Sequence, residues 1–228
     1  MLLAWCLMVF QEVFQIALPL EVQLGILAGA CAISTKLFVR GYTIWWLLDM
    51  ALALLLGFPY RISHLCSAVC LSLFLHAFTT RFTRKKLSPE EKERLTIPLL
   101  ILCGALIVMD IVAVSCIYPR MPAEFSEQLL ACVMLEGDKG VECYPVIGTG
   151  DFAFGCFLML LTNASVLAVV VPFFLATALY MHAPFHFSFF PFLTLFVPFQ
   201  LLFFVVERKI KTFASAFTAK RRHLQMEK

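Results

Sequence analysis

Eight long apolar stretches take up most of this 228-residue chain. A helix needs about 20 mostly apolar residues to cross the hydrocarbon core of a bilayer. The chain is 61% hydrophobic and only 14% charged, whereas a soluble domain carries roughly a quarter charged residues. This pattern excludes soluble globular, disordered and small disulfide-rich classes, and it predicts an all-α, polytopic membrane protein with about eight transmembrane helices. The expected spans, two of them short enough to leave a count of seven to nine open, are about 2–18, 22–39, 43–57, 62–80, 96–118, 146–161, 164–182 and 187–206.

The positive charges predict which side of the membrane each segment faces, because Lys and Arg are enriched in cytoplasmic loops. With eight spans and both termini inside, 15 of the 18 Lys and Arg residues fall on the inner side. The three exceptions are Arg61, Arg120 and Lys139. We therefore expect cytoplasmic termini and a first span that is retained and not removed as a signal peptide. The basic residues lie beside apolar spans, so a lipid bilayer is the expected partner and nucleic acid is not.

The same pattern predicts the organisation of the chain. We expect four regions: an N-terminal membrane region of four helices at 1–80, a basic cytoplasmic loop at 81–95, a second membrane region at 96–206 with an outer loop at 119–145, and a basic amphipathic cytoplasmic tail at 207–228. Ser88 and Pro89 begin a capping box, so a helix is expected to start in the basic loop. In the tail, Ile210 and Phe213 share an apolar face among basic residues. This suits a helix in the membrane interface, and a solvated basic tail fits equally well.

Carboxylates inside the predicted spans point to function, because a charge at the centre of a bilayer costs about 2.5–3.5 kcal/mol on insertion scales. There are four: Glu12, Asp49, Asp110 and Asp151. At a rise of 1.5 Å per residue, Asp110 lies about 12 Å and Asp151 about 9 Å below the outer ends of two consecutive, antiparallel spans. The two carboxylates could therefore face each other. Such a pair shares one proton, so that one member can accept a proton from water while the other donates one.

Three segments resemble the motifs of one family, the intramembrane aspartyl proteases of the presenilin and signal peptide peptidase group. They are Met109-Asp110, which is similar to the YD motif, Gly148-Thr149-Gly150-Asp151, which matches GxGD, and Pro191-Phe192-Leu193, which resembles PAL. The resemblance covers roughly residues 96–206, in the expected order and spacing. The predicted orientation of the spans is that of signal peptide peptidase. Met109 replaces the family tyrosine, Phe192 replaces the alanine, and the family has nine spans.

This resemblance implies an aspartic endopeptidase that cuts the transmembrane helices of other proteins, such as signal peptides. Asp110 and Asp151 would be the catalytic pair. The resemblance further implies that Met109, Thr149 and the 191–193 segment shape the site or hold the substrate, while the two glycines of GxGD allow close approach. No metal or other cofactor is implied. The expected location is the endoplasmic reticulum membrane in a eukaryote or the cell membrane in a prokaryote, with a homo-oligomer or membrane complex left open.

Two other functions remain open on the residues alone. The intramembrane acids could serve a proton- or cation-coupled transporter or channel, or the chain could be an inactive membrane scaffold. Glu12 and Asp49 could form a cation or proton site, although acids paired with neighbouring polar groups are the favoured reading. Most of the nine cysteines lie in apolar runs, where a thiol is a small apolar side chain. Cys132 and Cys143 lie in the outer loop and could form a disulfide there, and no metal-ligand spacing is present.

Overall fold

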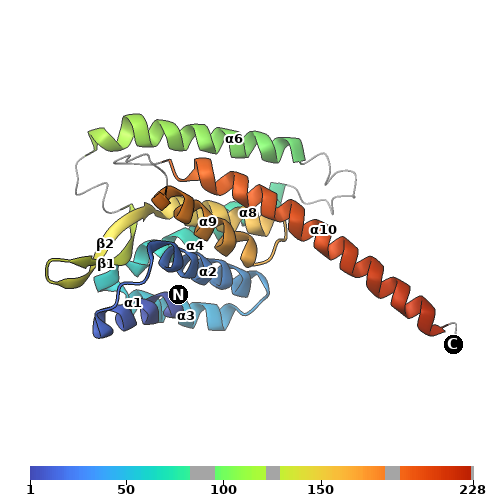
Figure 1. Cartoon of the computed structure of the whole chain (residues 1–228), viewed down its shortest axis with the longest axis horizontal. Helices are drawn as coiled ribbons and strands as arrows, with labels where there is room; N and C mark the ends of the chain where they lie inside the picture. Colours follow the sequence, from blue (N-terminus) through green and yellow to red (C-terminus); the bar gives the residue numbers. More distant parts are fainter. Residues whose placement is uncertain (83–95, 122–128, 183–190, 227–228) are drawn as a thin grey trace.

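The computed structural model describes residues 1–82, 96–121, 129–182 and 191–226. The predicted helix start at Ser88 lies outside these residues. The chain is mostly helical, with one small sheet (Figure 1). The main elements are α1 (Leu2–Phe14), α2 (Leu20–Val39), α3 (Thr43–Leu56), α4 (Ile62–Phe82), α6 (Thr96–Val112), β1 (Leu130–Gly137), β2 (Gly140–Gly148), α8 (Thr149–Leu161), α9 (Leu167–His182) and α10 (Leu193–Met226). A 3₁₀ turn (Phe58–Tyr60) precedes α4, and a π-helical turn (Ala113–Ile117) and a 3₁₀ turn (Tyr118–Arg120) follow α6.

A helix is found at each of the eight positions where a span is predicted, but their lengths differ. Within the described part of the chain, three helices are long and apolar enough to cross a membrane: Leu20–Val39, Ile62–Thr80 and Leu100–Ile117. Four others are apolar but have only 10–17 residues: Leu2–Phe14, Thr43–Leu56, Thr149–Leu161 and Leu167–His182. The expectation of about eight spans is therefore confirmed only in its coarser form, as a helical chain with membrane-length apolar helices.

The core of the helical bundle lies between α2, α4, α8, α9 and the first half of α10. Every residue from Phe152 to Met159 on α8 is buried, so this helix is surrounded by other helices. The rings of Phe152 and Phe173 stack with their centroids 4.8 Å apart, and Phe173 contacts the ring of Phe196 at 4.4 Å. The aromatic cluster fixes α8, α9 and α10 together, which determines where the start of α8 lies relative to the start of α10.

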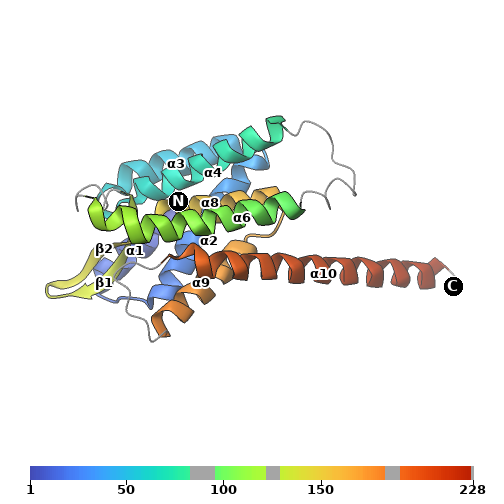
Figure 2. The same cartoon turned by 90° about the horizontal axis from the view of Figure 1, so that it is seen from above.

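Apolar side chains are exposed on α3 and α6, which lie at the outside of the bundle (Figure 2). On α3 these include Ile44 and Leu55, which are 73% and 78% exposed, and on α6 they include Ile101 and Val108. Apolar patches of this extent are rare on soluble monomers. These faces are suited to contact with lipid chains.

Part of the segment predicted as an outer loop, 119–145, forms a β-hairpin between α6 and α8. β1 pairs antiparallel with β2, with Gly137 opposite Gly140 at the turn. Gly140 has φ +113°, a conformation that favours glycine. The hairpin extends into the sixth predicted span, so α8 begins at Thr149 and not at 146. Apolar residues of β1 that looked like loop are buried against the helices, and this burial explains why they form a strand. Cys132 and Cys143 form a disulfide across the hairpin, with their Cα atoms 5.8 Å apart.

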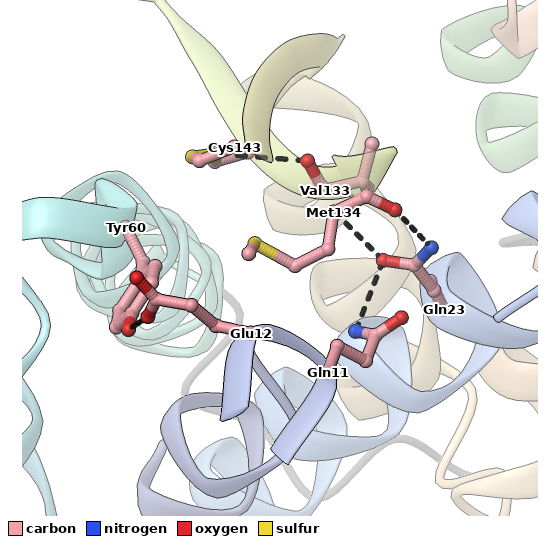
Figure 3. Close-up of a disulfide and its surroundings, with 8 residues drawn as sticks. Gln11, Glu12, Gln23, Tyr60, Val133, Met134 and Cys143 are labelled. Carbon is pink, nitrogen blue, oxygen red and sulfur yellow. Dashed lines mark hydrogen bonds between the residues drawn. A yellow bond between two sulfur atoms is a disulfide. The ribbon is translucent and has the colours of Figure 1, made fainter. Parts of the chain in front are cut away.

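Glutamine side chains attach the hairpin to the first two helices (Figure 3). The buried Gln23 of α2 donates from Nε2 to the Met134 carbonyl at 2.7 Å, and its Oε1 accepts from the Met134 N–H at 2.9 Å. It therefore pairs with the edge of β1 as a neighbouring strand would. Gln23 Nε2 also donates to the Leu18 carbonyl at 2.8 Å, and Gln11 Nε2 donates to Gln23 Oε1 at 3.3 Å. Gln15 accepts from the Val141 N–H of β2 at 3.0 Å. Because β2 leads directly into α8, these contacts also hold the start of α8 in place.

The predicted basic tail continues α10 as one helix to Met226, and this helix projects from the bundle at the end opposite the hairpin (Figure 1). Near the bundle, Glu207 of α10 binds the turn between α8 and α9. Its carboxylate accepts hydrogen bonds from the Ser165 N–H and hydroxyl, each at 3.0 Å, and lies 2.5 Å from Lys211 Nζ. Partial burial by itself raises the pKa of Glu207, but the hydrogen bonds from Lys211 and Ser165 outweigh it and hold the pKa below its ordinary value.

Acidification is expected to weaken this contact. Since the pKa of Glu207 is lower in the folded state, its contribution to stability is fully present above the ordinary glutamate pKa of about 4.3 and is lost as the pH falls through the folded value. The thermal unfolding midpoints of wild type and Glu207→Gln should therefore differ at about pH 7 and converge below about pH 4. Glu136→Gln, on the exposed hairpin, is the control and should match wild type throughout. A gap between wild type and Glu207→Gln that stays constant with pH would contradict this assignment.

Candidate functional site

Asp110 lies on α6, and its carboxylate is held by the first residue of α10. The backbone N–H of Leu193 donates to Asp110 Oδ2 at 2.9 Å. This N–H belongs to the first turn of α10, where backbone donors have no partner inside the helix. The start of a helix also carries partial positive charge, which favours a carboxylate. The PAL-like segment therefore meets the YD-like aspartate directly, although 83 residues separate them in the sequence.

Asp151 lies in the first turn of α8, immediately after β2. The backbone N–H of Gly148 donates to its carboxylate. A Cβ atom on Gly148 would lie 3.0 Å from Asp151 Oδ2, which is tighter than nearly all real contacts. A larger residue in place of the first glycine of GxGD would therefore push against the Asp151 carboxylate. A Cβ on Gly150 would meet open space. The backbone N–H of Thr149 donates to the Leu129 carbonyl at 3.0 Å.

Asp110 lies on α6 beside the start of α10, and Asp151 lies in the first turn of α8. The two carboxylates are near enough for an electrostatic interaction. Both side chains are half-buried, so water can reach them while the surroundings are largely apolar. Two carboxylates that interact in this way share a proton in preference to both being ionised. The arrangement can thus present one carboxylate and one carboxylic acid to the same reactant, which is the requirement for general acid–base chemistry.

The remaining residues predicted to shape the site are divided between two environments. Leu193 is buried and supplies the N–H to Asp110, and Pro191 accepts a hydrogen bond from the Thr194 hydroxyl at 2.6 Å. The ring of Phe192 packs on Phe173 at 5.1 Å, so the residue that replaces the family alanine is part of the aromatic core. Met109 is 66% exposed on the outer face of α6. Its side chain points to the surroundings of the bundle, and its predicted role in shaping the site stays a prediction.

The other two acids in the predicted spans form hydrogen bonds away from Asp110 and Asp151. Asp49 accepts from the Met1 ammonium at 2.7 Å and from the Leu2 N–H at 2.9 Å. Glu12 accepts a hydrogen bond from the Tyr60 hydroxyl (Figure 3). Each acid joins α1 to a neighbouring segment, which favours the structural reading over a cation or proton site. Among the residues that the structure describes, no three His, Cys, Asp or Glu side chains are placed to hold a metal ion.

Sequence patterns could not identify the two groups that hold the aspartates, because both are backbone N–H groups. The N–H of Leu193 becomes a ligand only once α6 lies beside the start of α10. Gln23 could have been noted as a polar residue in an apolar span, although its partner is 111 residues away.

Comparisons of the chain with models of protein families, with curated proteins and with solved structures find no match.

Proposed function

We propose that this chain is an intramembrane aspartyl protease that hydrolyses peptide bonds within transmembrane helices. The observation that carries the proposal is the hydrogen bond from the Leu193 N–H to Asp110, which joins the PAL-like segment to the YD-like aspartate. An electrostatic interaction between Asp110 and Asp151 of the GxGD segment supports it. A pair of acids used for ion transport would not require the PAL-like segment to bind one of them.

The chemistry follows from a shared proton. The ionised carboxylate takes a proton from a water molecule while the water oxygen bonds to the carbonyl carbon of the substrate. The neutral carboxylic acid donates its proton to the carbonyl oxygen, which gives a tetrahedral intermediate. When the C–N bond breaks, the aspartate that took the proton from water gives it to the leaving nitrogen. A hydroxyl of the intermediate returns a proton to the other aspartate, so the pair again holds one proton and the second product carries the new carboxyl group. The Leu193 N–H acts as a positioning group, because it fixes the orientation of Asp110 and touches no reacting atom.

The membrane setting of this proposal is an eight-helix bundle with both termini in the cytoplasm. It is supported by the position of the hairpin and of the basic tail at opposite ends of the bundle (Figure 1), as expected from the charge distribution. Since both aspartates lie on apolar helices, substrates would enter from the lipid phase, and single-span helices such as signal peptides fit this route. The compartment would be the endoplasmic reticulum membrane in a eukaryote or the cell membrane in a prokaryote.

The test is cleavage of a tagged single-span helix by the purified protein in detergent or liposomes. Mass spectrometry of the products should locate the cut inside the apolar segment, and a transition-state analogue of aspartyl proteases should block it. Proton and cation flux are measured on the same liposomes. Flux without cleavage would contradict the proposal and favour a transporter. If the folded protein shows no flux and no cleavage, the scaffold function is favoured instead.

Replacing Leu193 by proline is expected to lower the cleavage rate about 10- to 100-fold. Proline lacks the N–H that donates to Asp110, and a hydrogen bond to a charged group contributes about 1.5–3 kcal/mol. The helix itself should persist, because proline is accepted at the first helical position. Leu193→Val is the matched control: it keeps the N–H and loses one methylene from the buried side chain. Equal losses in the two variants would attribute the effect to packing and not to the hydrogen bond.

A further inference from the structure

An apolar groove of about 320 Å³ runs along α2 on the side facing α9, away from the two aspartates. Its lining on α2 includes Val22, Ile26, Gly29 and Ile33, and its lining on α9 includes Val170 and Phe174. Gly29 lets α2 and α9 approach closely beside the groove, since a Cβ at this position would lie 3.2 Å from Val170 Cγ2. This volume is at the lower end of the range for ligand sites.

The length of the groove corresponds to one leaflet of a bilayer. From Val22 to Ile33 the helix rises about 16 Å, since each residue adds 1.5 Å. The hydrocarbon core is about 30 Å thick, so one leaflet accounts for about half of it. Arg40 lies seven residues, about 10 Å, beyond Ile33, so a lipid with its phosphate beside Arg40 would place the far part of an acyl chain in the groove.

One end of the groove is basic. Lys36 and Arg40 follow Ile33 on the same face of α2, three and seven residues further on. Val166, which lines this end, is preceded by Ala164, whose carbonyl accepts a hydrogen bond from Lys36 Nζ. Lys36 interacts through space with Arg40, Lys211 and Glu207. Three cations and one carboxylate leave a formal charge of +2 where a lipid headgroup would lie.

We propose that this groove binds an anionic phospholipid of the cytoplasmic leaflet, with an acyl chain against Gly29 and Ile33 and the phosphate beside Lys36 and Arg40. The inference requires the membrane setting proposed above and does not depend on protease activity. Charge selects the occupant: a transmembrane helix would fill the apolar groove without using the cations, and a zwitterionic lipid would gain less from them. Basic residues at a membrane surface attract anionic headgroups in this way.

Native mass spectrometry of the full-length protein tests this with phosphatidylglycerol and phosphatidylcholine of identical acyl chains. Wild type should retain phosphatidylglycerol preferentially. Arg40→Gln should weaken its binding about five-fold, the effect of removing one cation, whereas Arg120→Gln on the outer side should not. Ile33→Trp should fill the groove and weaken binding at least about ten-fold, whereas Ile44→Trp, exposed on α3, should not.

Ile33 is 45% exposed, so its replacement should not disturb the core, and the unfolding midpoint of each variant without lipid verifies this. If Ile33→Trp does not fold, Arg40→Gln at the exposed end of α2 decides the question alone. Equal retention of the two lipids by wild type would overturn the proposal. Binding that is unchanged in Arg40→Gln would also overturn it.

Discussion

Asp110→Asn and Asp151→Asn are each expected to reduce cleavage of a single-span substrate by at least about 1,000-fold. Neither asparagine can accept a proton from water or donate one to a leaving group, and positioned acid–base groups contribute about 10²–10⁴-fold each. Because both members act on the same proton, the double variant should be scarcely worse than either single one. The measurement is the initial rate of product formation with purified protein.

Folding should survive these changes, which makes the result interpretable. The amide oxygen of an asparagine at 110 can still accept the N–H of Leu193, now 2.9 Å from Asp110 Oδ2. Glu12→Gln is the matched control, since it converts an acid on α1 that is bonded to Tyr60 and lies outside the pair. If Asp151→Asn kept wild-type activity, the dyad assignment would be wrong. If Glu12→Gln were equally inactive, the loss would reflect the structure and not the chemistry.

Gln23→Met is expected to lower the free energy of unfolding by about 3 kcal/mol. Methionine has a similar length but forms none of these hydrogen bonds, so it leaves the Met134 N–H and carbonyl and the Leu18 carbonyl without the partners they now have. Each unsatisfied buried backbone group costs about 1–3 kcal/mol. The loss should appear as a lower midpoint of thermal unfolding, followed by tryptophan fluorescence in detergent.

Gln15→Met provides the comparison for this prediction. Gln15 also binds the hairpin, through the Val141 N–H, but its side chain is exposed, so that water can replace the lost bond. Gln15→Met should lower the free energy of unfolding by less than about 1 kcal/mol. The role given to Gln23 would be refuted if both variants unfolded at the same temperature. Because the hairpin leads into Gly148, Gln23→Met should also reduce cleavage in the folded protein.

The sequence predicted much of the helical layout because apolar stretches and their breaks mark the helices directly. The pairing of Asp110 with Asp151 stays a prediction, argued from the equal depths of consecutive antiparallel helices. The hairpin was not predicted, because an apolar segment of eight residues such as Leu130–Gly137 can be strand, loop or helix until its neighbours are known. The neighbours of this strand include Gln23, which is distant in the chain.

The lengths of the helices and the exposure of the Met109 side chain were also beyond the sequence. An apolar residue beside a catalytic candidate can point inward or outward, and only the packing of α6 places Met109 outside. The start of α8 moved to Thr149 because backbone hydrogen bonds in the hairpin hold the preceding residues in a strand. In both cases, tertiary contacts decided between alternatives of similar local preference.

α6 is held much less firmly than the helix that carries the other aspartate. Only 11% of the Leu100–Ile117 segment is buried, whereas every residue from Phe152 to Met159 of α8 is buried, and the Leu193 N–H is a contact that ties Asp110 to the bundle. If Asp110 and Asp151 act as the proposed pair, its assembly should be a conformational equilibrium in its own right. A ligand that binds only the assembled pair stabilises it by RT ln(1 + [L]/Kd). A substrate that bridges both carboxylates would thus hold α6 in place, and its affinity would be reduced by the fraction of molecules in which α6 is displaced.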